Sequence, residues 1–400
     1  MDARWTICLG RSILACTFLL LVFGMGVRLL PVERKAIKSK RIQTIPATLH
    51  EKLPSDFPYK YLFIDLNGGV CRAIGRRMCN SRLLYDGGHL GFMYECDGSS
   101  PAPFIESTAS FASRIRELGI PFLYVQIPAK FALEEGQMPT GWPHYNPNAE
   151  ALQVEAELAE RGVRTLDLVR AFVATKEDVE RNFYKTDHHW QGRAAFAAAR
   201  LVACEIANVL DEPALRDPPE LDIANWTRHM RKGAFLGSHG RRTGRFFAGT
   251  DDFEYFVPNF ETKIRRSMSG KSRANGSYKK AVLEMHFLSR PLHDRNAYGV
   301  YGTDRNDVAY VNTKAKSRVK VLVVKDSFAN PVVGFLSTVC REIVKVDPRR
   351  CTSKEEIFQM VAKHRPDIVV MLVNPTALRN EKFMLTPAVR TPVPKGTMSR

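Results

Sequence analysis

The sequence lacks the motifs that would place it in several common protein classes. No C-x2-C pair occurs among its eight cysteines, so cysteine spacing gives no support for structural zinc. Zinc-finger spacing, an aromatic RNP-like motif and a basic region with heptads are all missing, which makes nucleic acid the least favoured partner. No internal repeat is found. The 400 residues are 44% hydrophobic and 25% charged, which is typical of a globular protein.

Acidic residues are scarce relative to basic ones. The 59 Lys and Arg exceed the 42 Asp and Glu, giving a formal net charge of +17. Such an excess favours an anionic partner such as a phospholipid surface or an acidic polymer. The alternative is a basic protein with no polyanionic partner.

Long apolar runs are missing except for one near the N-terminus, SILACTFLLLVFGMGV, between Arg11 and Arg28. It is short for a bilayer span of about 20 residues and long for a signal-peptide core of about 7–15. No A-x-A cleavage site follows, so we expect an uncleaved, single-pass anchor over 1–31 and a basic linker over 32–58. A cleaved signal is the alternative. Either way, the remaining chain is expected outside the cytoplasm, on one side of the cell membrane.

Six cysteines lie outside the apolar run: Cys71, Cys79, Cys96, Cys204, Cys340 and Cys351. An even number in an exported domain is compatible with disulfides, for which close pairs such as Cys71 and Cys79 are candidates. Free buried thiols are the other interpretation.

The rest of the chain alternates apolar runs with helical patterns. We expect buried strands at 61–70, 120–128, 163–169, 318–325, 342–346 and 367–373, and helices at 103–119, 148–162, 330–340 and 353–364. Gly119 and Gly162 are suited to end the first two helices. This alternation predicts an α/β/α fold with a mostly parallel sheet over 59–385. A long irregular insertion is expected at about 211–315, and a disordered tail at 386–400.

The turn VVKDSFANP places Ser327 directly after a predicted strand and before a predicted helix. A serine there projects from the carboxyl edge of the sheet, where open α/β folds bind ligands. The helix N-terminus behind it favours an oxyanion. Ser327 is therefore a candidate nucleophile, and the alternative is a helix-capping role shared with Asp326.

A serine nucleophile needs a base and an orienting partner, and YKTDHHWQG, which begins at Tyr184, offers both. Asp187 and His189 stand two residues apart, so in an extended or turn conformation they project to the same side. A metal site built from Asp187, His188 and His189 is less favoured, because adjacent histidines point apart in a strand and a helix needs i, i+4 spacing. The third interpretation is a helix entry with solvated histidines.

FYKTDHHW resembles the signature of the DHHW protein family, which is similar to the alginate O-acetyltransferases of the AlgX/AlgJ type within the SGNH-hydrolase-like superfamily. The stretches NGGVCRAIGRRMCN, LYVQIPAKF, FLGSHGRRTG and VLVVKDSFANP agree, so the resemblance covers about residues 60–375. It implies an SGNH-hydrolase-like fold in which Asp187 orients, His189 is the general base and Ser327 the nucleophile. It departs from the family pattern at Lys325, where a glycine is usual.

The resemblance also implies an activity and partners. It points to O-acetylation of a cell-surface or exported polysaccharide through an acetyl-serine. The acceptor would be an acidic or neutral glycan, with a membrane-bound O-acyltransferase as acetyl donor and no cofactor. An acetylesterase of the same fold and a non-catalytic glycan-binding protein are the alternatives, and Lys325 favours the latter.

Further residues are candidates for substrate or oxyanion binding. In FLGSHGRRTG, glycines permit close backbone approach and arginines bind carboxylate or phosphate groups. The others stand at or near predicted strand ends or in the DHHW segment. The candidates are Gly237, Ser238, Arg241, Arg242, Lys130, Asn330, Asn374 and Tyr184.

Overall fold

A computed structural model describes residues 59–93, 98–142, 145–302 and 305–386. The predicted anchor, the linker and nearly all of the predicted tail lie outside these residues. Within the described ranges, no helix has both the length and the apolar character needed to cross a bilayer.

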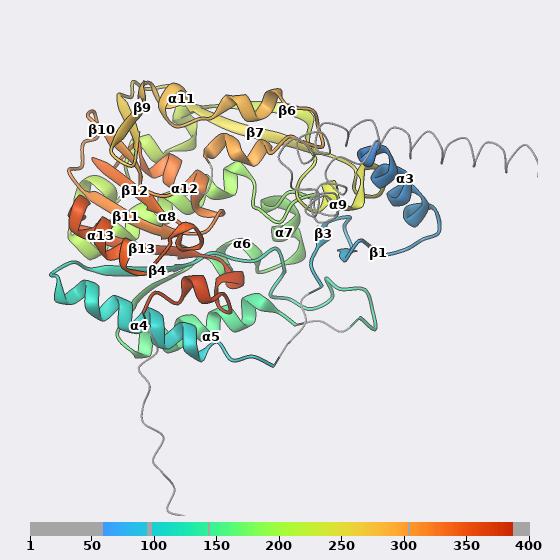
Figure 1. Cartoon of the computed structure of the whole chain (residues 1–400), viewed down its shortest axis with the longest axis horizontal. Coiled ribbons are helices and arrows are strands. Elements are labelled where there is room, and N and C mark those ends of the chain that lie inside the picture. The colour runs from blue at the N-terminus through green and yellow to red at the C-terminus, as the bar shows by residue number, and fades with distance from the viewer. Residues whose placement is uncertain (1–58, 94–97, 143–144, 303–304, 387–400) are drawn as a thin grey trace, which may run out of the picture.

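An eight-stranded sheet forms the centre of the molecule (Figure 1). Its order is β5 (Arg164–Asp167), β4 (Phe122–Gln126), β13 (Ile368–Val373), β11 (Lys320–Lys325), β12 (Glu342–Val346), β10 (Val308–Asn312), β8 (Ile264–Met268) and β9 (Lys271–Gly276). The first five strands are parallel, whereas β10, β8 and β9 are antiparallel to their neighbours. The predicted α/β sheet is confirmed, but it is mixed rather than mostly parallel.

Helices cover both faces of the sheet, because the strands are apolar on both sides. In β11, Val321 and Val323 pack in one hydrophobic cluster, while Leu322 and Val324 pack in another. The first cluster joins the sheet to α8 (Gly192–Leu210), α12 (Ala329–Leu336) and the hairpin of β6 (Trp226–Phe235) and β7 (Asp251–Pro258). The second joins it to α4 (Ala102–Glu117), α5 (Pro147–Glu160) and α13 (Glu355–His364). Gly119 and Gly162 follow α4 and α5 with positive φ, as predicted for helix ends.

Smaller elements complete the described chain. They are α3 (Lys60–Ala73), β1 (Met78–Cys79), β2 (Arg82–Leu84), β3 (Leu90–Gly91), α6 (Val169–Val173), α7 (Lys176–Asn182), α9 (Gly240–Thr243), α10 (Arg245–Ala248) and α11 (Tyr278–Ala281). Short 3-10 turns lie at Pro213–Leu215, Pro219–Leu221, Ile223–Asn225, Met285–Ser289, Ala297–Tyr301, Pro348–Arg350, Pro375–Ala377 and Glu381–Phe383.

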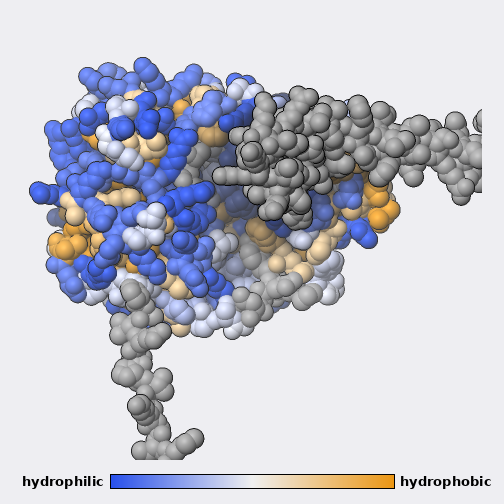
Figure 2. All heavy atoms as spheres, in the orientation of Figure 1, coloured by the Kyte–Doolittle hydropathy of each residue, from blue (hydrophilic) through white to orange (hydrophobic). Residues whose placement is uncertain are grey.

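Two sequence predictions about the fold are wrong. The apolar run 61–70 is not a strand but the centre of α3, whose Leu62, Leu66 and Val70 are exposed. Figure 2 shows an apolar area at the end of the molecule where Figure 1 labels α3. The insertion at 211–315 is also more regular than expected, because it supplies the β6–β7 hairpin and three strands of the main sheet.

The cysteines of the described residues are unpaired. Cys71, Cys79, Cys204, Cys340 and Cys351 are free thiols, and all but Cys204 are buried. These five cysteines therefore fit the interpretation as free thiols rather than as disulfides.

Candidate active site

Ser327 stands at the carboxyl end of β11, between the strand and α12. The turn is shaped by the buried Asp326, whose carboxylate accepts the backbone N–H groups of Phe328 (2.9 Å) and Asn374 (2.7 Å). The first residue before α12 is Phe328, and no side chain caps that helix. The hydroxyl of Ser327 instead faces an imidazole, so the capping interpretation does not describe its contacts.

Asp187, His189 and Ser327 form a continuous hydrogen-bonded triad. The Nε2 atom of His189 lies 2.8 Å from Ser327 Oγ, although 138 residues separate the two. On the other side of the ring, Nδ1 lies 2.6 Å from Asp187 Oδ1. With the proton on Nδ1, the ring donates to the carboxylate and accepts from the serine hydroxyl, which is the geometry that general-base activation of a serine requires.

The carboxylate of Asp187 is held by more than the imidazole. Its Oδ1 also accepts the backbone N–H of His189 at 2.9 Å, and its Oδ2 accepts that of Ser238 at 2.5 Å. Burial opposes ionisation, but the charges of His188 and His189, with the bonds from His189 and Ser238, hold the pKa of Asp187 well below its usual value. The carboxylate is thus an anion at neutral pH.

Aromatic residues fix the plane of the His189 ring. Tyr298 stacks on it with ring centroids 3.9 Å apart and an interplanar angle of 14°. Trp190 donates its indole N–H to the carbonyl of Phe328 at 3.0 Å, and the Tyr298 hydroxyl donates to the same carbonyl at 3.2 Å. The tryptophan that follows the two histidines in the sequence therefore ties their loop to the turn that carries Ser327.

Lys130 is buried against the same loop and does not face bulk solvent. It is 2% exposed, and its Nζ contacts the backbone carbonyls of Leu90 (2.7 Å), Tyr184 (2.5 Å), Lys185 (2.9 Å) and Asp187 (2.9 Å). Burial lowers its pKa to about 7, and the nearby carboxylates of Asp251 and Asp187 oppose that shift. The expectation that this lysine is solvated is wrong, whereas its contact with a glycan stays a prediction, because Lys130 also lines the cavity of Ser327.

Asp251 and Gly237 complete the support of this loop. Asp251 accepts the backbone N–H groups of Lys185 and Thr186, both at 2.7 Å, and the Thr186 hydroxyl at 2.6 Å. Gly237 donates its N–H to that hydroxyl at 2.9 Å. A Cβ atom at Gly237 would lie 2.3 Å from the Cβ of Asp187, so this glycine is needed for packing against the triad.

His188 contacts the triad without joining it. Desolvation by the surrounding protein and the neighbouring His189 lower its pKa to about 3, and its Nδ1 lies 2.8 Å from Ser238 Oγ. Ligand atoms of Asp187, His188 and His189 all lie within 4.8 Å of one another, a spacing that a metal ion could use. Asp187 Oδ1 and both Nδ1 atoms already have hydrogen-bonding partners, so the contacts fit a proton relay better than a metal site.

Ser327 opens into a cavity of about 140 Å³ at the carboxyl edge of the sheet. Parallel strands that lie side by side supply its wall: Ala129 and Lys130 follow β4, Asn374 and Thr376 follow β13, and Arg349 follows β12. Phe92, His188, Asp326 and Phe328 complete the lining. Sequence reasoning missed Phe92, Arg349 and Thr376. For Arg349 and Thr376 a signal existed, since both follow predicted strands.

Asn374 and Asn330 differ in their place relative to this cavity. Asn374 lines it and uses Oδ1 to accept the N–H and hydroxyl of Thr376. Asn330 is buried on α12, with its Oδ1 3.4 Å from Lys345 Nζ, and is not part of the lining. Tyr184 is likewise a core residue, packed edge-on against Phe235, and not a ligand-binding residue.

A second, larger cavity of about 840 Å³ lies beside the first. Its lining includes three of the predicted substrate-binding residues, Ser238, Arg241 and Arg242. The remaining lining residues are Lys60, Tyr61, Ile64, Asn80, Arg290, His293 and Asp294. The hydrogen bond between Ser238 and His188 joins the walls of the two cavities, because His188 lines the cavity of Ser327.

Comparisons with known proteins agree with the fold. Residues 100–272 match the family model of the SGNH hydrolase-like domain of acetyltransferase AlgX, a stretch that includes Asp187 and His189 but ends before Ser327. No curated protein sequence matches the chain.

Two solved structures share the fold at low identity, and a third match has a lower TM-score. PatB1 of Bacillus cereus is 18% identical with a TM-score of 0.60, covering 76% of this chain and 99% of that one. A DHHW family protein of Eubacterium siraeum DSM 15702 is 18% identical with a TM-score of 0.58, covering 77% and 95%. The O-acetyltransferase domain of Pseudomonas putida AlgJ is 12% identical with a TM-score of 0.43, covering 74% and 92%. The predicted resemblance is thus confirmed in two findings: residues 100–272 match the AlgX-type SGNH hydrolase-like domain, and a DHHW family protein shares the fold.

Proposed function

We propose that this chain is a serine-dependent O-acetyltransferase that modifies an exported or cell-surface polysaccharide. The observation that carries the proposal is the hydrogen-bonded triad of Asp187, His189 and Ser327 at the carboxyl edge of the sheet. The similarity to the AlgX acetyltransferase domain supports the type of group transferred.

In the first step, His189 Nε2 takes the proton of Ser327 as Oγ attacks the acetyl carbonyl carbon. The donor's leaving group receives that proton and departs, which leaves an acetyl-serine. In the second step His189 removes the proton of a sugar hydroxyl, whose oxygen attacks the acetyl-serine. The proton returns to Ser327 Oγ, and the acetylated sugar is released. The Nδ2 group of Asn374 is a candidate donor to the oxyanion, because its Oδ1 is already engaged.

The larger cavity is the place we assign to the acceptor glycan. Lys60, Arg241, Arg242 and Arg290 outnumber its one carboxylate, Asp294, which favours an acidic over a neutral polymer. Tyr61 stacks on His293 with centroids 4.6 Å apart and offers an aromatic edge of the kind sugars pack against. Its link to the triad through Ser238 and His188 would place a bound glycan beside Ser327.

Lys325 no longer favours the non-catalytic alternative, although its position in the sequence did. Its side chain is fully buried, with Nζ 3.5 Å from Asp347 Oδ2, and it is not part of the lining of the Ser327 cavity. The Asp347 carboxylate compensates the charge of Lys325, and the hydroxyl of Ser327 remains hydrogen-bonded to His189.

The proposal extends to the anchoring of the domain and to its supply of acetyl groups. The apolar run near the N-terminus is proposed to hold the domain at the outer face of the membrane. A membrane-bound O-acyltransferase would deliver acetyl groups there. The carbohydrate acetylesterase is the second candidate, and it differs only in using water in the second step.

The test is transfer of labelled acetyl from p-nitrophenyl acetate to acidic and neutral oligosaccharides. The wild type should label the oligosaccharide and react with a fluorophosphonate probe at Ser327. Ser327→Ala and His189→Ala should abolish transfer, while Ser353→Ala, an exposed serine, should leave it unchanged. Full transfer by both triad variants would refute the proposal, and hydrolysis without transfer to any sugar would identify an esterase.

A further inference from the structure

A separate cavity of about 210 Å³ lies on the antiparallel side of the main sheet. Its floor consists of neighbouring strands whose residues pair across the sheet. Val308 of β10 stands opposite Met268 of β8 and Lys345 of β12, and Tyr310 stands opposite Arg266. Because residues two apart in a strand share a face, these side chains all project to the same side of the sheet.

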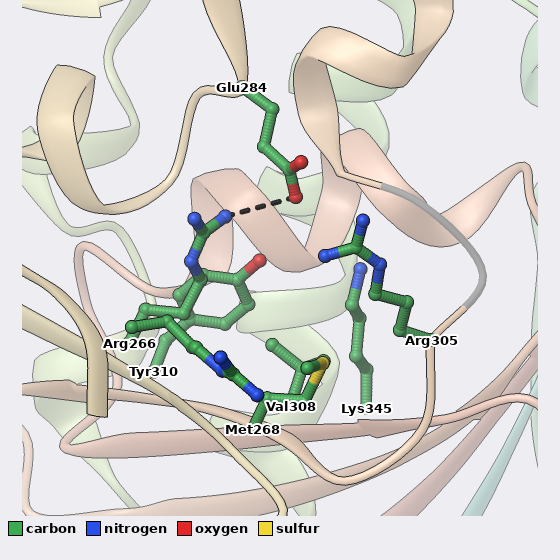
Figure 3. A pocket seen from close by; sticks show the side chains of 8 residues that line it. Arg266, Met268, Glu284, Arg305, Val308, Tyr310 and Lys345 are labelled. Carbon is green, nitrogen blue, oxygen red and sulfur yellow. Dashed lines mark hydrogen bonds and ion pairs between the residues drawn. The ribbon is translucent and has the colours of Figure 1, made fainter. Parts of the chain in front are cut away.

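The charged groups of this cavity are mainly cationic. Arg266 and Lys345 project from the floor, Arg273 comes from β9, and Arg305 comes from the segment before β10. Among the described residues of the lining, Glu284 is the one carboxylate, and its Oε1 accepts from Arg266 Nη1 at 3.0 Å. In Figure 3 the ends of Arg266, Arg305 and Lys345 point into the space below the Glu284 carboxylate.

Lys345 makes this more than an exposed basic surface. It is 2% exposed, yet it extends from a central strand to the cavity wall, with Nζ 3.4 Å from Asn330 Oδ1. Burial also raises the pKa of Tyr310 to about 12, so its hydroxyl keeps its proton at neutral pH and can donate to an anion.

We propose that this cavity binds the phosphate or carboxylate group of a small anionic ligand no larger than about one sugar unit. Guanidinium groups recognise both kinds of oxyanion, and the described lining carries three arginines and one lysine beside one carboxylate. The volume lies below the roughly 300 Å³ at which drug-sized sites begin, which fits a single small ligand. Met268 and Val308 give the cavity an apolar wall against which a sugar ring can pack.

The site is distinct from the proposed acetyltransferase site. The two cavities share no lining residue. They are connected through one path, in which Lys345 meets Asn330 and the Asn330 N–H donates to the Ser327 carbonyl at 3.2 Å. Because the two cavities share no lining residue, ligand binding to the cavity at β8, β10 and β12 can be measured in an assay that does not involve acetyl transfer.

The experiment is calorimetric titration of the purified protein at fixed ionic strength with inorganic phosphate, glucuronate and glucose. Arg305→Gln removes an exposed cation and Lys345→Met a buried one. Because Arg305 is exposed, its variant should fold normally, so it tests the proposal even if Lys345→Met does not fold. Each should weaken binding of the anions about 10-fold, which corresponds to about 1.4 kcal/mol. The matched control is Arg265→Gln, an exposed neighbour of Arg266 on the opposite face of β8, which should change affinity less than about 2-fold.

Two results would overturn the proposal. One is failure of phosphate and glucuronate to bind the wild type with a Kd below about 10 mM. The other is an equal loss in Arg265→Gln and Arg305→Gln, which would indicate general attraction to a basic surface. Binding of phosphate alone would support a phosphate site, and binding of both anions without glucose would support a broader oxyanion site.

Discussion

Replacing Asp187 by asparagine tests the triad most sharply, because every contact of this carboxylate is as an acceptor. Its Oδ1 faces the backbone N–H and the Nδ1 of His189, and its Oδ2 accepts the N–H of Ser238. An asparagine amide has one acceptor and one donor end. If Nδ2 turns to Ser238, two N–H donors face each other. If it turns to His189, it opposes the backbone N–H and forces Nδ1 to accept, which places the ring proton on Nε2, toward Ser327.

The expected losses follow from these two orientations. A buried donor left without an acceptor costs about 1–3 kcal/mol of unfolding free energy. The wrong tautomer of the base costs about 10⁴-fold in kcat in a serine triad. Asp187→Asn should therefore remain folded at room temperature but lose nearly all acetyl-ester turnover.

The assay is release of p-nitrophenol from its acetyl ester, with urea unfolding measured in parallel. Glu254→Gln is the control, since Glu254 is also buried and also accepts a backbone N–H, that of Arg193, without touching the triad. It should lose stability to a similar degree and retain turnover within about 3-fold. Turnover of Asp187→Asn within about 10-fold of wild type would show that the carboxylate does not set the state of His189.

Three further variants test the surroundings. Lys130→Met leaves four backbone carbonyls without their buried donor and should lower the unfolding free energy by about 3–5 kcal/mol in urea titration. An unchanged unfolding free energy would show that these carbonyls do not need Lys130. Gly237→Ala should cost about 1–3 kcal/mol and about 100-fold in turnover, because its Cβ would overlap Asp187, whereas Gly69→Ala, with ordinary contacts, should cost little. Burial raises the pKa of Glu155 to about 7, above its unfolded value of about 4.3, so the wild type should lose stability as pH rises between these values. Glu155→Gln should remove this loss, gaining roughly 3 kcal/mol on wild type between pH 5 and pH 8, and a constant difference would contradict it.

The strands and helices of the C-terminal half could be predicted because their local pattern is unambiguous. The runs 318–325 and 367–373 are short, β-branched and apolar, and both form buried central strands. The run 61–70 is also mainly apolar but lies in a helix, because a short apolar run fits either period and only tertiary packing decides.

The antiparallel half of the sheet gave no comparable signal. β8 and β9 read IRRSM and KSRANG, and neither shows an apolar alternation. Their order depends on pairing with β10, which in turn pairs with β12 from the parallel half. Such strands are fixed by long-range hydrogen bonds rather than by hydrophobic alternation. The local sequence therefore predicted an irregular loop at these positions.

The candidate site shows the same division between local and long-range information. The spacing of Asp187 and His189 is a local property, and so is the place of Ser327 after a strand. The burial of Lys130 is not, because a lysine at a strand end is ordinarily solvated, and its acceptors come from Leu90 and from the returning loop at 184–187, both distant in sequence.

The strand order explains why the site lies where it does. In β4, β13, β11 and β12, which are adjacent and parallel, the chain turns at one edge of the sheet, and a polar residue follows each: Lys130, Asn374, Ser327 and Arg349. Each of these could be listed from the sequence as a residue after a strand, but their meeting depends on an order of pairing that local patterns do not contain. His189 reaches this edge from outside the sheet, and the bond from Trp190 to the Phe328 carbonyl sets its distance from Ser327. Since that bond joins the loop of the base directly to the turn of the nucleophile, the tryptophan next to the histidines is part of the geometry and not only of the core.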